Sequence, residues 1–170
     1  MKKTLLLFFV ALFVLSLTAA LYAAEDIKKH PSCKYCGMDR EKFAHSRMLI
    51  EYDDASQVGT CSLHCAAIDL ALNLDKTPRT IWVGDYNTKN LVNAEKAFWA
   101  IGGGKPGVMT KRAKWAFAEK VDAEKFIKEN GGTPGDFDAA LKAAYEDIAD
   151  DTKMIRERRR MMRQKMMEKK

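Results

Sequence analysis

Four cysteines in two close pairs constrain the fold of this chain more than any other feature. The stretch HPSCKYCGMDREKF holds Cys33 and Cys36 as C-x2-C, and GTCSLHCA holds Cys61 and Cys65 as C-x3-C with His64 between them. A short loop of either kind can direct two sulfurs at one centre, and two such loops on separate elements can complete a cage of four ligands. The spacing therefore predicts one shared metal site, with His64 as a further candidate ligand.

Two other interpretations of the cysteines stay open. A pair of structural disulfides would suit an oxidising compartment, although a chain of 170 residues can fold around its own core without them. A thiol–disulfide exchanger built on Cys33 and Cys36 would lack its usual βαβ setting. Haem attachment is excluded, because neither pair reads C-x-x-C-H.

A methionine beside the first pair bears on the identity of the metal. Met38 follows Cys36 after one glycine, and Gly37 lets the backbone turn so that both sulfurs can face one ion. A thioether is a soft, neutral ligand that suits Cu(I) and adds little for zinc. The alternative is that Met38 fills the core, as a lone methionine commonly does.

The first 24 residues have the layout of a secretory signal peptide. Lys2 and Lys3 precede an apolar run that ends in small residues at Ala23 and Ala24. Cleavage there would export the protein, and we expect it in a bacterial periplasm. The alternative is an uncleaved membrane anchor, since an apolar run of about 20 residues is just long enough to span a bilayer. No cysteine ends this segment, so the usual signal for bacterial lipidation is missing.

Charge divides the remaining chain into a body, residues 25–151, and a tail, residues 152–170. The tail has nine Lys and Arg, two acids and five of the nine methionines, a net charge of +7, whereas the body carries −3. An acidic body gives no support to nucleic-acid binding. The tail could collect Cu(I) with its methionines, or contact an anionic membrane surface or an acidic partner. The alternative is a solvated, partly disordered segment.

The body is predicted to be a small α+β domain. Apolar patterns predict strands at 47–52, 57–61 and 79–86, a strand that runs into a glycine-rich loop within 96–107, and a strand at 113–119. Helices are predicted after Ser62 as N-cap, at 121–132 with Asp122 as cap and Gly131–Gly132 as stop, and at 137–149. The order of strands and helices indicates a weak internal duplication. No Ser/His/Asp set or carboxylate pair marks a catalytic site, so we expect no enzyme.

Four stretches give the chain a family resemblance. CKYCGM, IWVGDY, NAEKAFWAIGG and WAFAEKVDAEKFIKENGG follow one another, with Met109 between the last two. With these stretches in this order, the chain resembles the NosL family from residue 33 to residue 132. Members of this family are copper-binding accessory proteins of nitrous-oxide reductase maturation. The resemblance implies that Cys36 and Met38 are copper ligands.

The first half also resembles the TRASH and YHS metal modules, which are treble clefs. In these modules a knuckle with a Cys-Gly-Met-like motif supplies the first ligands, and C-x3-C at a strand–helix junction supplies the others. Here that second pair is Cys61 and Cys65. The resemblance implies two related, treble-clef-like strand–strand–helix units and a C-terminal helix. Compared with the NosL family, this chain lacks a lipidation cysteine and carries the additional Cys61, His64 and Cys65.

These features together predict a non-enzymatic, exported Cu(I) chaperone. Its ligands would be Cys36, Met38 and one or both of Cys61 and Cys65, with Cys33 as a further ligand or as a disulfide partner of Cys36 without metal. Soft ligands can be exchanged one at a time with those of a metal-receiving periplasmic protein, such as nitrous-oxide reductase. The alternative is a structural zinc module for protein contact, with four thiolates that saturate Zn(II).

Overall fold

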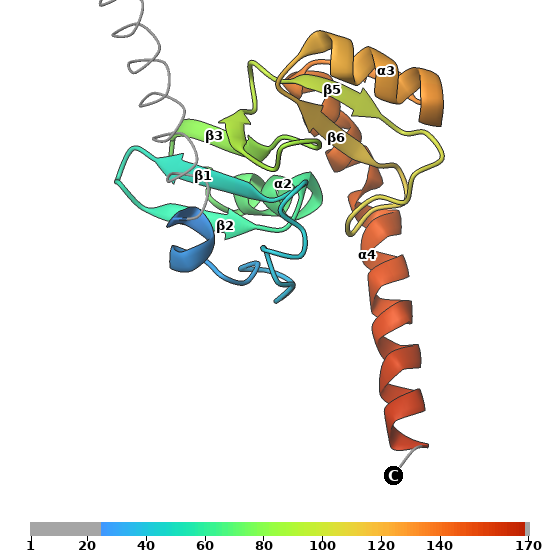
Figure 1. Ribbon diagram of the computed structural model, residues 1–170. Helices are drawn as coiled ribbons and strands as arrows, with labels where there is room; N and C mark the ends of the chain where they lie inside the picture. The colour runs from blue at the N-terminus through green and yellow to red at the C-terminus, as the bar shows by residue number, and fades with distance from the viewer. Residues whose placement is uncertain (1–24, 169–170) are drawn as a thin grey trace, which may run out of the picture.

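A computed structural model describes residues 25–168, so the predicted signal peptide lies outside the described residues. Two antiparallel sheets stand next to each other, and a long C-terminal helix runs past both (Figure 1). The four-stranded sheet has the order β2-β1-β3-β4, with β1 at Met48–Tyr52, β2 at Gln57–Thr60, β3 at Pro78–Gly84 and β4 at Leu91–Asn93. The three-stranded sheet has the order β6-β5-β7, with β5 at Phe98–Ile101, β6 at Lys114–Phe117 and β7 at Thr133–Gly135.

The first sheet grows from the hairpin that the sequence predicts. β1 is buried except at Glu51, and it pairs with β2 on one side and β3 on the other. A side chain stabilises the hairpin turn: the Asp54 carboxylate accepts a hydrogen bond from the Ser56 N–H at 2.9 Å. Two residues, Cys61 and Ser62, separate the end of β2 from helix α2, Leu63–Leu72. Ser62 is its N-cap residue, but the Ser62 side chain makes no capping hydrogen bond.

The second sheet is also followed by a helix. β5 and β6 form an antiparallel hairpin, and α3, Lys120–Asn130, comes directly after β6. The prediction of Asp122 as the cap is wrong: Glu119 occupies the N-cap, and Asp122 lies in the first turn, where its charge suits the helix dipole. Gly131 ends the helix as predicted, with a φ of +75° that favours glycine.

The α+β class is thus confirmed, with a hairpin followed by a helix in both halves. That the two halves are related treble-clef-like units stays a prediction. Buried side chains form two clusters. One lies under the first sheet and includes Ile50, Trp99 and Phe137; the other joins the aromatic residues of the second half to the buried cysteines.

The last helix, α4, spans Phe137–Met167. Its predicted end at Ala149 is wrong. Residues up to Met154 contribute buried side chains; beyond that point the helix is mostly exposed, and its last turns extend away from the body (Figure 1). Arg, Met, Lys, Gln and Glu are good helix formers and no Gly or Pro interrupts them, so the basic segment extends a helix that is already nucleated. Within residues 25–168, no helix combines the length and apolar character needed to cross a bilayer.

Candidate metal centre

The first cysteine pair lies on a tight knuckle. Ser32 and Asp39 form an isolated β-bridge, and inside it the Cys33 N–H donates to the Met38 carbonyl at 2.8 Å. The Gly37 N–H donates a hydrogen bond to the Cys33 carbonyl at 2.9 Å. Gly37 has a φ of +74°, which other residues adopt only with strain. The local turn chemistry therefore brings the side chains of C-x2-C to one side.

A buried arginine fixes this knuckle to the first sheet. The guanidinium of Arg40 donates to the Thr60 carbonyl at 3.1 Å and pairs with the Asp26 carboxylate at 2.7 Å. The Lys34 N–H donates to the Gly59 carbonyl of β2 at 3.1 Å. A Cβ at position 59 would lie 2.6 Å from the Cβ of His30, so only glycine allows this close approach. The knuckle consequently faces the end of β2.

The second pair stands at the junction of β2 and α2. Cys61 directly follows the strand, and Cys65 lies in the first turn of the helix. The Ser46 hydroxyl donates to the Cys61 carbonyl at 2.8 Å and holds the junction. A strand end and a helix start thus supply one sulfur each.

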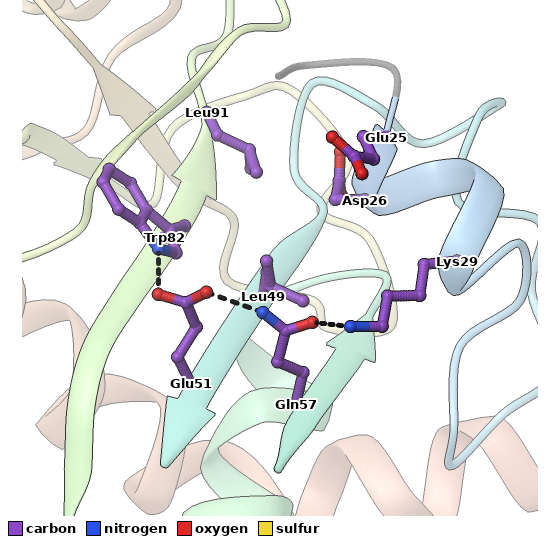
Figure 2. A pocket seen from close by; sticks show the side chains of 8 residues that line it. All are labelled: Glu25, Asp26, Lys29, Leu49, Glu51, Gln57, Trp82 and Leu91. Atoms are coloured by element: carbon purple, nitrogen blue, oxygen red, sulfur yellow. Dashed lines mark hydrogen bonds between the residues drawn. The ribbon is translucent and has the colours of Figure 1, made fainter. Parts of the chain in front are cut away.

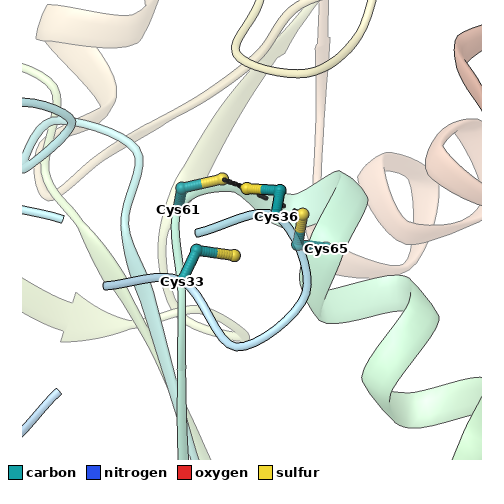
Figure 3. A group of neighbouring side chains, drawn as sticks. All are labelled: Cys33, Cys36, Cys61 and Cys65. Carbon is teal, nitrogen blue, oxygen red and sulfur yellow. Dashed lines mark hydrogen bonds between the residues drawn. The ribbon is translucent and has the colours of Figure 1, made fainter. Parts of the chain in front are cut away.

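The four sulfurs converge on one centre (Figure 3). All four Sγ atoms lie within 4.8 Å of one another; Cys36 is 3.4 Å from Cys61, and Cys61 is 3.8 Å from Cys65. With metal–sulfur bonds of about 2.3 Å, sulfurs around one tetrahedral ion lie roughly 3.8 Å apart, so the group fits a single ion. All four are free thiols, and within residues 25–168 this is the only such group of cysteine, histidine and acidic side chains.

Crowding distributes the thiol protons unevenly. Hydrogen bonds from Cys36, and then from Cys61 and Cys65, hold the pKa of Cys33 far below its ordinary value. Contact with Cys33 raises the pKa of both Cys61 and Cys65 far above theirs. The hydrogen bond with Cys33 raises the pKa of Cys36. Hydrogen bonds with Cys61 and Cys65 outweigh this effect, so that the pKa of Cys36 is lowered overall. Buried thiolates this close repel one another, so a thiophilic cation is the natural replacement for the protons.

One edge of the cluster is open. Cys33, Cys61 and Cys65 are at most 2% exposed, whereas Cys36 is only partly buried. Cys36 and Met38 line a cavity of about 570 Å³, together with Met109 and Met162. Met109 has a φ of +61°, which a side chain other than glycine rarely adopts and which often marks a functional site. Three thioethers therefore line the space that adjoins the exposed thiol.

His64 does not join the cluster. Successive residues on a helix point about 100° apart, so the side chain next to Cys65 is directed elsewhere. The His64 imidazole is 2% exposed, and its Nδ1 lies 3.5 Å from the Asp151 carboxylate of α4. Burial lowers its pKa. The structure thus places His64 between α2 and α4, and its position gives no support to its predicted role as a ligand.

A buried carboxylate that the sequence did not reveal also holds the knuckle. Asp69 of α2 is fully buried and accepts hydrogen bonds from the hydroxyls of Tyr35 and Tyr52, each at 2.5 Å. The Lys34 ammonium pairs with it at 3.0 Å. Burial, followed by these hydrogen bonds, raises the pKa of both tyrosines. Asp69 therefore fastens the C-x2-C knuckle to the helix that carries Cys65.

A second hollow, of about 450 Å³, lies on the outer face of the first sheet (Figure 2). A row of hydrogen bonds crosses it: Trp82 to Glu51 at 3.0 Å, Gln57 to Glu51 at 2.7 Å and Lys29 to Gln57 at 2.7 Å. Its polar groups thus satisfy one another. No cysteine, histidine or methionine lines it, so this hollow offers no soft ligand for a metal.

Comparison with known proteins assigns the chain to a family. The NosL family model matches residues 24–144. The chain belongs to the NosL family. The crystal structure of the copper chaperone NosL from Shewanella denitrificans is similar, with a TM-score of 0.52 and 22% identity over 63% of this chain and 87% of that one. The solution structure of apo-NosL from Achromobacter cycloclastes has a TM-score of 0.38 and 21% identity, and covers 53% of this chain and 81% of that one. No curated protein sequence matches.

The first of these structures supports the fold. The family match ends at residue 144, inside α4, so the exposed half of that helix lies beyond it. The residues that line the cavity from α4, among them Met162, lie outside the family match.

Proposed function

We propose that this protein is a copper(I) chaperone that binds the ion at its cysteine cluster and passes it to a receiving protein. Membership of the NosL family supports the proposal, as does its likeness to a NosL structure described as a copper chaperone. The four converging thiols supply soft ligands of the kind that Cu(I) prefers.

The observation that carries the proposal is the open edge of the cluster at Cys36 and Met38. A structural site closes around its metal, whereas a site that hands metal on needs a position that an incoming ligand can reach. Cys36 is the cluster thiol that adjoins the cavity, and the thioethers of Met38, Met109 and Met162 line the same space. Copper held near Cys36 would therefore be accessible to the ligands of a partner.

The proposed ligands are Cys36, Met38 and one or both of Cys61 and Cys65. Cys33 is close enough to be an additional thiolate ligand. His64 is left out of this set because its imidazole faces Asp151. The wider course of delivery is part of the proposal: export to a periplasm by a signal peptide at residues 1–24, and transfer to a cuproenzyme such as nitrous-oxide reductase.

A second function has one observation in its favour. Three of the four thiols are almost fully buried, and four thiolates at this spacing would saturate Zn(II) as a structural module. Such a site would have no use for the thioethers beside Cys36.

Competition for the two metals separates the candidates. Reduced protein is titrated anaerobically with Cu(I) against a Cu(I) chelator and, separately, with Zn(II) against a zinc chelator, and bound metal is counted by elemental analysis. The proposal predicts tight binding of Cu(I) that depends on Cys36 and survives a modest excess of zinc. Retention of zinc alone, with copper displaced, would establish the structural module and refute the chaperone.

A further inference from the structure

The distal helix, residues 155–167 of α4, is exposed and strongly basic. It carries six of the tail's nine Lys and Arg. Its four methionines are each at least 50% exposed: Met161, Met162, Met166 and Met167. The body carries the opposite net charge, −3. This segment lies beyond the family match, and the metal cluster itself does not require it.

One side of the distal helix forms a wall of the cavity beside the cluster. Ile155, Arg158, Arg159 and Met162 line that space opposite Cys36 and Met38. These four positions follow the spacing of one helix face. The Arg159 guanidinium also donates to the carbonyl oxygen of Cys36 at 3.1 Å. The distal helix thus contacts the residue that bears the partly exposed thiol, although the two residues lie 123 positions apart in the sequence.

The two arginines have no counter-charge in the described part of the chain. No carboxylate there forms an ion pair with Arg158 or Arg159, and no acidic residue lines the cavity. Arginine binds carboxylates through paired N–H donors, which makes it suited to hold an acidic group. The cavity therefore presents cationic donors and soft sulfur ligands to the same occupant.

We propose that this cavity is the docking site for an acidic, ligand-bearing segment of the metal-receiving protein. Carboxylates of that segment pair with Arg158 and Arg159, and its own soft ligand reaches the metal at Cys36. The inference rests on the proposed function. A volume of about 570 Å³ exceeds what one ion needs and suits several side chains of a peptide segment.

A protein segment fits these observations better than a membrane surface. An anionic bilayer could be met by any of the exposed arginines, including Arg156 and Arg160, which do not line the cavity. Arg158 and Arg159 instead share their cavity with the exposed cluster thiol. Charge attraction would thus bring the partner to the one place where the ion can be transferred.

Transfer at this site needs no redox change. The partner's sulfur donates a lone pair to Cu(I) as the bond between copper and Cys36 breaks, and copper remains Cu(I). Cys36 keeps the electron pair of that bond and is released as a thiolate, so the exchange needs no proton transfer. The methionine thioethers can hold the ion during the exchange because they are neutral and bind it weakly.

Two synthetic peptides test the docking site. Both carry the core Cys-Gly-Gly-Cys, whose thiolates can compete for Cu(I), flanked on each side by two aspartates in one and by two lysines in the other. Copper-loaded protein is mixed with each peptide anaerobically, and the loss of copper from the protein is followed by rapid gel filtration. We expect the acidic peptide to remove copper at least about tenfold faster at low salt, with the advantage declining as salt is added.

A charge-reversal pair and a matched control locate the effect. The double variant R158E/R159E should abolish the preference for the acidic peptide. R156E/R160E makes the same change in net charge on the opposite side of the helix and should retain it. Copper affinity is measured against a chelator in both variants, and the preference is the ratio of the two peptides' rates within one variant, so that a change in affinity does not alter it. Equal loss of preference in both variants would reduce the effect to net charge and overturn the docking site.

The remaining outcomes separate this inference from the function on which it rests. Wild-type protein that binds no Cu(I) would refute the proposed function itself. Wild-type protein that binds Cu(I) but serves both peptides equally would refute the docking site alone. If the distal helix in addition binds phosphatidylglycerol vesicles, that last result would identify the basic surface as a membrane contact instead.

Discussion

The two halves of the molecule share a plan but differ in what holds their helices. In the first half, the hairpin of β1 and β2 leads into α2. The first turn of α2 supplies Cys65 to the sulfur cluster, and its Asp69 binds Tyr35 of the C-x2-C knuckle. In the second, the hairpin of β5 and β6 leads into α3, which is held by apolar contacts. Phe126 packs on Tyr86 and Phe117, with ring centroids 4.9 Å and 5.2 Å apart.

This difference indicates a division of labour. Aromatic packing in the second half contributes stability whether or not a metal is present. The first half keeps four reactive thiols and a buried carboxylate that a core would not otherwise contain, and these serve the site. The stability of the fold and the binding of metal should therefore respond to different substitutions.

The largest effect is expected from Phe126→Ala, which removes a ring that is 6% exposed in the second half. We expect a loss of about 3–5 kcal/mol in the free energy of unfolding, measured by urea denaturation. The same protein, below its unfolding transition, should bind Cu(I) with unchanged affinity. Val121→Ala is the control on the same helix; Val121 is 67% exposed, and the change should stay within about 0.5 kcal/mol. Parallel loss of copper binding in the folded variant would contradict the division of labour.

The next effect is expected at the cluster. The double substitution C61S/C65S removes both sulfurs supplied by β2 and α2 and should weaken Cu(I) binding by at least about 100-fold, or roughly 2.7 kcal/mol. A hydroxyl of similar size keeps the shape of the site, so the far-ultraviolet circular dichroism of the metal-free protein should hardly change. Chelator competition gives the affinity. Undiminished copper binding would place the site elsewhere, with the methionines of the distal helix as the next candidates.

A smaller effect is expected from Met38→Leu, which conserves volume and removes the thioether. We expect Cu(I) affinity to fall by about tenfold, or roughly 1.4 kcal/mol, while Zn(II) affinity stays the same because zinc makes little use of a thioether. Met48→Leu is the matched control, since Met48 is fully buried in the first core cluster and not in the cavity. Equal copper affinities for the Met38 variant and wild type would remove Met38 from the ligand set.

The smallest effect concerns pH. Burial lowers the pKa of all three histidines, His30, His45 and His64, below the ordinary value of 6.5. The unfolded chain therefore takes up protons near pH 6.5 and the folded chain only at lower pH, so this contribution to stability is complete above about pH 6.5 and declines as the pH falls. Urea denaturation of metal-free, reduced protein at pH 7.5 and 5.5 measures the decline.

His45 allows this contribution to be assigned to the second half. Its ring lies 5.4 Å from that of Trp115 and 5.8 Å from that of Tyr86, centroid to centroid. His45→Asn should lessen the decline in stability between pH 7.5 and 5.5. An identical decline in the variant would show that His45 titrates alike in the folded and unfolded chains.

The sequence predicted those features that depend on neighbouring residues. C-x2-C and C-x3-C spacing, with Gly37 at the turn, directs the two sulfurs of each pair to one side because each pair is a local loop, and the predicted meeting of the four is confirmed. Distant contacts of Arg40 and Asp69 hold the two pairs together. Apolar periodicity gave the hairpins and the helices. It missed what distant packing decides: the burial of Asp69 beneath two tyrosines, and the turn of His64 toward Asp151.

The distal helix shows the same limit. Its block of basic residues favoured a solvated tail in the sequence, because charge repulsion was weighed without the helix that precedes it. Packing of Phe137, Ala140 and Ala144 fixes the first turns of α4, and the following residues then only have to extend it. Its contact with the cavity joins residues more than 100 positions apart and had no signal in the local pattern.

The most direct test of the central claim is whether the metal can leave the folded protein. Protein loaded with one Cu(I) per chain is challenged anaerobically with an excess of a Cu(I) chelator, and copper loss and circular dichroism are recorded together. We expect copper to depart completely while the fold persists, because the second half holds the structure and Cys36 opens the site. Copper that leaves only as the protein unfolds would make the cluster a structural centre and refute its role as a transfer site.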